Sequence, residues 1–483
     1  MILRKKRLLV SIILCLQCFN TGANYKFDND ADNISDHIIA YQDILTELAQ
    51  LNEICIVKQQ GSEEHVERKK KKNFTAILFM SADNDLQSFA VRNIRQMAAL
   101  GSNDYLNIVV HLDIRIGSKK VTRRFYVEKD NVIEFTGPDM MDSGDPETLI
   151  SHVKFAVENF PAEHYMLILW NHGTGPLDPV SSRIVKPVDL FTFNPVTYKL
   201  ELDRTLEYFN FIQESDEPHL GVCWDDSTHH YLTNQKLQYA FNTIKRDILG
   251  GQKFDIIAFD ACMMAAIEID HLLKDYAHIS IASQEVELGT GWYYQKVFTP
   301  FQHGPIDPYD LAKHIVKVYE QSYKPITNDY TLSAVNLDLI DKLVINVDII
   351  ARLLNDCLNQ QKNNSAKKAI AAARHRKACV HFNEPSYIDW YDFCNNLQKH
   401  VKYIALKDSQ NTLRMQNILQ AALEESKTLV NAIVLENVTG KNLNRAKGIL
   451  IYFPERRIHS SYPKIPFAET EWLTFLTNYL LMA

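Results

Sequence analysis

Two stretches of the chain join a short apolar run to a single reactive side chain. The run in 165–175 (YMLILWNHGTG) leads into His172, and the run in 254–266 (FDIIAFDACMMAA) leads into Cys262. About five apolar residues bounded by polar or small ones predict a strand covered on both faces, as in a parallel sheet. Residues just beyond such strands line the ligand crevice of open α/β sheets. If the strands are neighbours, an imidazole and a thiol meet there, as a cysteine nucleophile requires.

Each of the two residues alone also fits a structural role. A lone cysteine in an apolar segment is usually an inert small hydrophobe, and a lone histidine is usually a hydrogen-bonded polar residue. The pair favours chemistry, because both residues follow the same pattern of strand and break among small neighbours. Gly173 lets a substrate backbone come close, and Ala261 leaves the thiol uncrowded.

Around these motifs the chain resembles the clostripain family of cysteine peptidases, which are relatives of caspases, gingipains and legumain. The His-Gly of WNHGTG and the Asp-Ala-Cys of FDACMMA are similar to the two active-site signatures of that family. Other segments resemble family segments in family order: FMSADNDL, NIVVHLD, GDPETL, FPAEHY, ASQEVELGTGW, TLSAVNLDLID, YIDWYDF and GILIYFP. The resemblance runs from about Asn73 almost to the end of the chain. It implies a cysteine endopeptidase with a caspase-like three-layer α/β/α sandwich.

The resemblance gives the residues of both motifs a role. Cys262 attacks the peptide carbonyl, His172 protonates the leaving amine, and the backbone N–H groups of Gly173 and Cys262 hold the oxyanion. A helix expected to begin near 261–263 favours the thiolate through its dipole. No third residue can be assigned from the sequence, although Asn171 is a candidate for orienting the histidine.

Asp260 carries the information on the substrate. An acid at this position resembles the floor of the family's specificity pocket, where it pairs with arginine or lysine just before the scissile bond. The structural alternative is a helix N-cap two places before the cysteine. Thr290 stands where some relatives have a second acid, so one carboxylate is expected in the pocket and the choice between arginine and lysine stays open. Gly289 and Gly291 suit a loop that closes over substrate, and Trp292 is expected to wall the pocket.

The first 23 residues have the composition of a secretory signal peptide. Basic residues at 4–7 precede an apolar core at 8–16, and small residues at 21–23 suit cleavage. This pattern predicts export to the periplasm or the exterior. The alternative is a lipid anchor on Cys18.

Residues 24–72 are expected to be a pro-segment or linker. The segment is strongly charged and ends in the basic run 68–72, a composition that favours an exposed connection. If the enzyme cuts after basic residues, the run is a substrate tethered to its own catalyst. We therefore predict a self-processing zymogen that is cut at Lys72.

A catalytic core is expected over 73–305, where strand and helix patterns alternate and predict a mostly parallel sheet with helices on both faces. The region 306–483 is expected to be mainly helical and, by the family likeness, integral to the fold. The long insertion 176–220 carries a second predicted cut after Arg183. Lys186 is a poorer site because it precedes a proline.

Composition excludes several other classes of protein. A formal net charge of −7 without a basic stripe argues against nucleic acid, and no later run reaches the roughly 18 apolar residues of a membrane span. No metal-ligand spacing accompanies His229 and His230, so neither metal nor cofactor is expected in the chemistry. The resemblance adds calcium, because clostripain requires it, although no calcium loop is readable. A catalytically silent caspase-like binding protein and a metal-dependent hydrolase stay as alternatives. The oligomeric state is not predicted.

Overall fold

The computed structural model describes residues 56–58, 70–117, 119–135, 137, 139–178, 187–206 and 222–482. The predicted signal peptide with Cys18 and the predicted cut at Arg183 lie outside these residues. Within them, no helix is long and apolar enough to cross a membrane.

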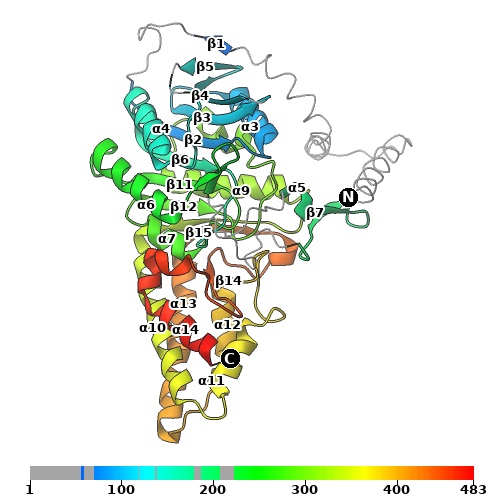
Figure 1. Ribbon diagram of the computed structural model, residues 1–483, viewed down its shortest axis with the longest axis vertical. Coiled ribbons are helices and arrows are strands. Elements are labelled where there is room, and N and C mark those ends of the chain that lie inside the picture. The colour runs from blue at the N-terminus through cyan, green and yellow to red at the C-terminus, as the bar shows by residue number, and fades with distance from the viewer. Residues whose placement is uncertain are drawn as a thin grey trace.

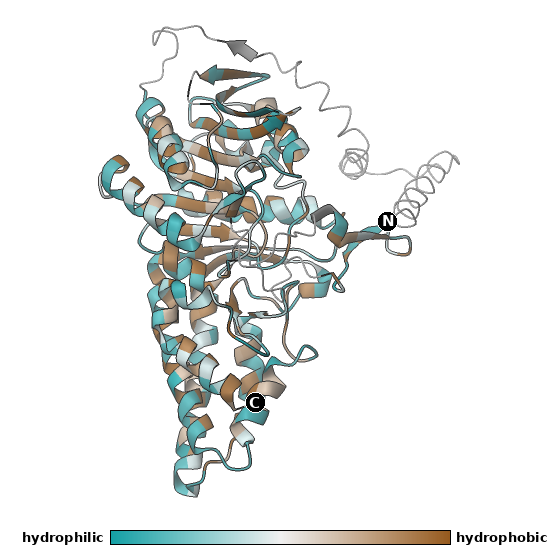
Figure 2. Ribbon diagram, viewed as in Figure 1, coloured by the Kyte–Doolittle hydropathy of each residue, from teal (hydrophilic) through white to brown (hydrophobic). Residues whose placement is uncertain are grey.

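A ten-stranded sheet forms the centre of the molecule (Figure 1). Its strands in spatial order are β1 (Ile56–Lys58), β5 (Asn131–Phe135), β4 (Lys119–Glu128), β3 (Leu106–Ile116), β2 (Lys72–Ala82), β6 (Ala162–Trp170), β11 (Phe254–Asp260), β12 (Ala277–Ala282), β13 (Thr331–Asn336) and β15 (Val434–Thr439). The five strands from β3 to β12 are mutually parallel. They are buried on both faces, which explains their continuous apolar runs. Figure 2 shows these runs as the hydrophobic centre of the fold.

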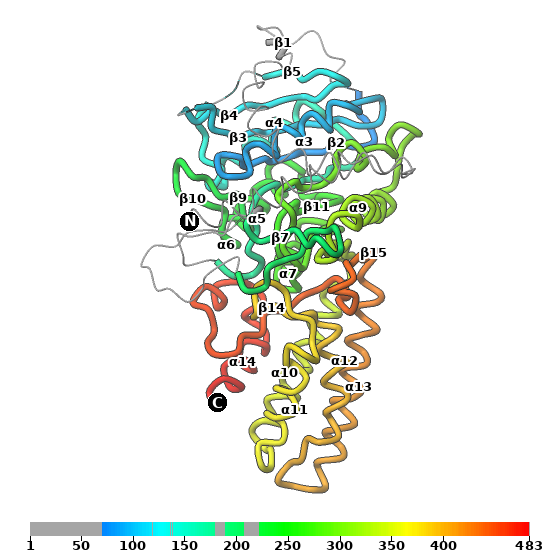
Figure 3. Tube along the Cα trace, turned by 90° about the vertical axis from the view of Figure 1, so that its right-hand side faces the viewer, coloured from blue at the N-terminus to red at the C-terminus, as the bar shows by residue number. Residues whose placement is uncertain are grey.

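Helices cover both faces of the sheet and complete the predicted three layers (Figures 1 and 3). The helices of the first part of the chain are α3 (Gln87–Leu100), α4 (Pro146–Asn159), α5 (Pro187–Leu190), α6 (Asn234–Thr243), α7 (Ile267–Leu273), α8 (Tyr294–Val297) and α9 (Pro308–Tyr323). Helix α4 begins after Asp145, because the Asp145 side chain accepts a hydrogen bond from the backbone N–H of Glu147. Short two-stranded sheets are formed by β7 (Phe191–Asn194) with β8 (Lys199–Leu202), β9 (Val222–Asp225) with β10 (His230–Leu232), and β14 (Tyr387–Asp389) with β16 (Leu450–Tyr452).

The second part of the chain is mainly helical, as predicted, and extends away from the sheet (Figure 1). Its long helices are α10 (Ile340–Gln360), α11 (Ser365–Arg374), α12 (Trp390–Val401), α13 (Ser409–Ile433) and α14 (Glu471–Leu481). It also supplies β13 and β15, which pair antiparallel and continue the main sheet beyond β12. Because one sheet is built from both parts, the helical region shares its core with the catalytic part.

One strand comes from the segment expected to be a linker. Strand β1 pairs in parallel with β5 at the edge of the sheet. The sequence did not predict this strand, because three residues are too few for a periodic pattern.

Two histidines lie in the core between the sheet and α4. His111 and His152 are fully buried, their ring centroids are 5.2 Å apart, and His111 stacks on Phe79 at 4.7 Å. Burial, with Arg124 and Lys120 nearby, lowers the pKa of His111 to about 3. Burial and then the neighbouring His111 also lower the pKa of His152. Both rings are therefore neutral in the folded protein at neutral pH.

Acidification from pH 7 to pH 5 is expected to weaken the fold through these two rings. The unfolded chain binds protons at histidine below about pH 6.5, whereas folded His111 does so only near pH 3. The contribution of the two neutral rings to the free energy of unfolding is thus complete above pH 6.5 and is lost as the pH falls. For His111 alone the loss is roughly 2 kcal/mol. Urea unfolding of the wild type and a His111→Phe/His152→Leu variant at both pH values measures it, and equal losses in the two proteins would contradict the assignment.

Candidate active site

The two reactive residues occupy matching positions on neighbouring strands. Strands β6 and β11 are parallel partners, and their last paired residues are Trp170 and Asp260. His172 and Cys262 each stand two residues beyond that pair, and both line one pocket. The sequence-based expectation that the strands are neighbours is therefore confirmed.

The pocket opens at the carboxyl end of the parallel strands. Its lining residues are Leu86, Trp170, Asn171, His172, Asp260, Ala261, Cys262, Glu287, Leu288, Gly289 and Gly291. A Cβ at Gly173 would lie 2.4 Å from the carbonyl oxygen of Cys262, so only glycine allows this close approach of the two motifs. The backbone N–H of Glu287 donates to Sγ of Cys262 over 3.2 Å. Such a donor stabilises negative charge on the sulfur.

The helix expected to begin at 261–263 begins later. Helix α7 starts at Ile267, and its N-cap is Ala266. Met263 has a φ of 57°, which is left-handed backbone that no helix contains, and its N–H donates to the carbonyl oxygen of Glu285 over 3.2 Å. The expectation that a helix dipole acts on Cys262 is therefore wrong, because backbone contacts with another segment take the place of helical hydrogen bonds.

Asp260 does not cap a helix. Its Oδ2 accepts a hydrogen bond from the backbone N–H of Trp292 over 3.0 Å and another from the hydroxyl of Tyr294 over 2.8 Å. The side chain lines the pocket. The N-cap alternative for Asp260 is thus excluded, and the residue lines the cavity.

A second carboxyl, which the sequence analysis missed, lies beside the first. Glu287 lines the pocket and is 4% exposed. Burial raises the pKa of Asp260 to about 7, and burial together with the charge of Asp260 raises the pKa of Glu287. The expectation of one carboxylate is therefore corrected. The sequence feature that could have indicated this second carboxyl is the acid directly before Leu288 in ASQEVELGTGW.

The other predicted pocket residues take different places. Gly289 and Gly291 line the cavity. The carbonyl oxygen of Thr290 accepts a hydrogen bond from the Asn93 amide over 3.2 Å. Trp292 is 1% exposed and contributes its backbone N–H to Asp260, and it is not among the lining residues.

Asp85, and not Asn171, contacts the imidazole of His172. Oδ1 of Asp85 lies 2.8 Å from Nε2 of His172. The Asn171 side chain instead accepts from the backbone N–H of Trp224 over 3.1 Å and donates to the carbonyl oxygen of Ser81. It holds neighbouring segments together, whereas Asp85 acts on the ring itself.

Comparisons with known proteins identify the family of this chain. The sequence model of the clostripain family matches residues 78–187 and 210–473. The chain belongs to the clostripain family. Clostripain from Hathewaya histolytica is 22% identical over 405 residues, which are 72% of this chain and 69% of that protein. As a member of this family the protein is a cysteine endopeptidase.

Two solved structures of the family share the fold. One is a secreted C11 cysteine protease from Bacteroides thetaiotaomicron in complex with an irreversible peptide inhibitor. It has a TM-score of 0.52 and 18% identity and covers 84% of this chain and 98% of its own. The other is an inactive zymogen C11 protease from Parabacteroides distasonis, with a TM-score of 0.52, 18% identity, and 84% and 99% coverage. They support the three-layer sandwich with its mostly parallel sheet.

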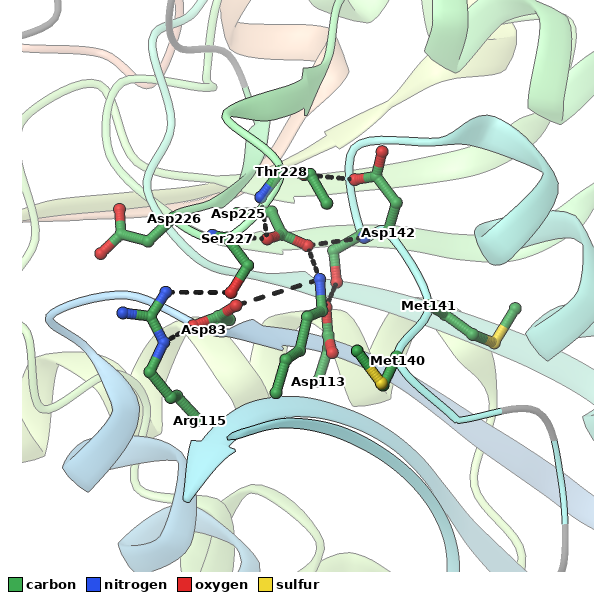
Figure 4. Close-up of polar contacts among 12 residues, drawn as sticks. Asp83, Asp113, Arg115, Met140, Met141, Asp142, Asp225, Asp226, Ser227 and Thr228 are labelled. Carbon is green, nitrogen blue, oxygen red and sulfur yellow. Dashed lines mark hydrogen bonds and ion pairs between the residues drawn. The ribbon is translucent and has the colours of Figure 1, made fainter. Parts of the chain in front are cut away.

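A buried ionic cluster lies close to the site of this clostripain-family chain. Nζ of Lys120 is 2.9 Å from Asp113 and 4.0 Å from Asp83, and it also contacts Asp225. Nε of Arg115 lies 3.0 Å from Oδ1 of Asp83. Figure 4 shows the carboxylates converging from different segments. The cluster joins β2, β3, β4 and β9, with Lys120 as its central cation.

Calcium, which the family resemblance implies, has no fitting set of donors in the described ranges. No group of three or more His, Cys, Asp or Glu side chains there is arranged to hold a metal ion. The closest approach to such a group is formed by Asp83, Asp113 and Asp225, and the ammonium of Lys120 already lies between them. Among the other described cysteines, Cys223, Cys357, Cys379 and Cys394 are buried thiols outside any disulfide.

Lys72 is the first residue of β2. Its backbone N–H donates to the carbonyl oxygen of Pro161 over 3.1 Å, and its ammonium donates to the hydroxyl of Tyr126 over 3.1 Å. A peptide bond in a protease site must be extended and accessible. Lys70 and Lys71 are exposed and precede the strand, so they meet this condition better than Lys72.

Proposed function

We propose that this clostripain-family enzyme is an exported endopeptidase that cleaves after arginine or lysine through Cys262 and His172. One observation carries the proposal: the parallel register of β6 and β11 brings both residues to a pocket whose floor holds two buried carboxyls. We further propose that the enzyme is made as a self-processing zymogen.

The reaction begins when the thiol of Cys262 gives its proton to His172. The thiolate attacks the peptide carbonyl, and the N–H groups of Gly173 and Cys262 hold the oxyanion, where one donor is worth ~2.7–4 kcal/mol. The imidazolium of His172 then protonates the leaving amine as the peptide bond breaks. Water, after losing a proton to the imidazole, hydrolyses the acyl-enzyme and restores the thiol. The Glu287 N–H supports the anionic sulfur from 3.2 Å.

Asp260 and Glu287 favour a cationic side chain before the scissile bond. Two adjacent buried carboxyls resist ionising together, so the empty pocket retains a proton. A guanidinium or ammonium entering the pocket stabilises the ionised forms and releases that proton. A neutral side chain offers no such compensation and leaves buried acids without a cation.

Asp260→Asn is expected to reduce the preference for arginine over glutamine before the scissile bond by roughly 10- to 150-fold. This range corresponds to the loss of one charge-assisted hydrogen bond of ~1.5–3 kcal/mol. Glu287→Gln is expected to change the ratio in the same direction, since it removes charge at nearly constant volume. The measurement is kcat/KM for two fluorogenic peptides that differ only at that position. A ratio unchanged in both variants would remove the carboxyl pair from specificity.

Export and processing have separate support. The basic, apolar and small-residue pattern of 1–23 suits a signal peptide, and the Bacteroides relative is described as secreted. The Parabacteroides relative is described as an inactive zymogen. We place the first cut in the basic run ahead of Lys72, at Lys70 or Lys71, and a second in the insertion after Arg183. Strand β1 would then stay bound to β5 without a covalent link.

A further inference from the structure

The imidazole of His172 has a carboxylate partner from a distant part of the chain. Its Nε2 lies 2.8 Å from Oδ1 of Asp85, which is 87 positions away in the sequence. The His172 side chain is 1% exposed and that of Asp85 is 16% exposed. Since Nε2 contacts this carboxylate, our mechanism assigns to Nδ1 the exchange of a proton with the thiol of Cys262.

We propose that Asp85 is the positioning residue of the catalytic histidine. Its carboxylate accepts the Nε2–H of His172, which fixes the tautomer and the ring orientation and stabilises the imidazolium that forms when Cys262 loses its proton. The transferred proton moves only between Sγ, Nδ1, the leaving amine and water. This inference rests on the proposed mechanism with Cys262 and His172.

The loop that carries Asp85 is held in place by hydrogen bonds of the Asn84 side chain. The Asn84 amide donates to the carbonyl oxygens of Ser81 over 3.0 Å and Trp224 over 2.9 Å. Its side-chain oxygen accepts the backbone N–H of Leu86 over 2.9 Å. These bonds fix the residues on both sides of Asp85. The carboxylate is therefore set in place before substrate arrives, which is the condition for efficient electrostatic assistance.

The ionic cluster anchors the same loop at Asp83, where the chain leaves β2 (Figure 4). Asp83 pairs with Arg115 and faces Lys120, and its carbonyl oxygen accepts the backbone N–H of Asp226 over 2.8 Å. Only one residue separates Asp83 from Asp85. A cluster that looks unrelated to catalysis thus lies two positions from the group that orients the histidine.

Charges near His172 come from several elements. Asp85 contacts the ring from the loop after β2, whereas Cys262 and Asp260 reach the pocket from the end of β11 and Glu287 from the loop after β12. Burial raises the pKa of both Asp260 and Glu287, so these two retain protons to higher pH than an exposed acid. Asp85 is the acid in direct contact with the imidazole, so its removal affects the imidazolium most.

Asp85→Asn tests the proposal. We expect kcat/KM for an arginyl peptide to fall ~100-fold or more, because an oriented proton-transfer group contributes ~10²–10⁴-fold. The alkaline limb of the pH–rate profile, where the imidazolium loses its proton, should move to lower pH. Asp85→Glu keeps the charge and should keep the limb. The matched control is Asp104→Asn, which removes an exposed acid just ahead of β3 and should change neither quantity.

Active sites are counted by titration with a thiol-reactive arginyl peptide, so that loss of folded enzyme does not enter kcat. An Asp85→Asn enzyme with wild-type rate and profile would overturn the proposal. So would a slow enzyme whose alkaline limb is unmoved, because that result indicates a purely structural role. Full activity of His172→Ala would instead overturn the underlying mechanism, and the two failures are therefore distinguishable.

Discussion

Replacing Cys262 with alanine is expected to abolish hydrolysis of arginyl and lysyl peptides. The thiol is the only group in the pocket that our mechanism uses to form the acyl-enzyme, and loss of a nucleophile that acts together with its base costs on the order of 10⁶-fold in kcat. The variant should fold normally. Although Cys262 is buried at 3% exposure, the substitution removes only its sulfur. Initial rates on a fluorogenic arginyl peptide give the measurement.

The same variant reports on processing. End-group sequencing of purified wild type should find new termini after basic residues ahead of Lys72 and within the insertion, whereas Cys262→Ala should lack both. Cys357→Ala is the matched control, because this thiol is buried as well but lies in α10. Identical chain lengths for wild type and Cys262→Ala would contradict self-processing. Peptide hydrolysis that survives in Cys262→Ala would contradict the nucleophile itself.

Lys120→Met is expected to destabilise the fold by about 3–5 kcal/mol, the usual cost of leaving a buried charge unpaired. Lys120 is 6% exposed and faces Asp83, Asp113 and Asp225. Burial lowers the pKa of this lysine, but the carboxylates of Asp113 and Asp225 outweigh burial and raise it. The lysine is thus charged when folded, and methionine removes the cation that Asp113 and Asp225 contact, whereas Asp83 keeps Arg115. Urea unfolding in a Cys262→Ala background, which prevents self-digestion, measures the change.

Lys119→Met provides the matched control for this prediction. Lys119 is the adjacent residue of β4 and is exposed, so its loss should change stability by less than about 0.5 kcal/mol. Adding Asp113→Asn to Lys120→Met removes one of the surplus charges and should recover part of the lost stability. Equal stability of Lys119→Met and Lys120→Met would show that the cluster is not held by its lysine.

The catalytic motifs could be predicted from the sequence because their signals are local. A strand buried on both faces must be apolar along its whole length, so β6 and β11 are visible as runs that break at His172 and Cys262. The long helices are equally visible through their periodicity. The local prediction of a helix at 261–263 failed, because backbone bonds to another segment replace helical hydrogen bonds there.

The sequence by itself determined that a histidine and a cysteine stand at the ends of strands, because apolar patterning depends only on neighbouring residues. Tertiary structure decided which groups surround them. Asp85, Glu287 and Lys120 come from segments far apart in the chain, and their identities become informative only once the strand order brings them together. Contacts between distant polar residues leave no periodic trace in a sequence, since each acid alone is compatible with an exposed turn.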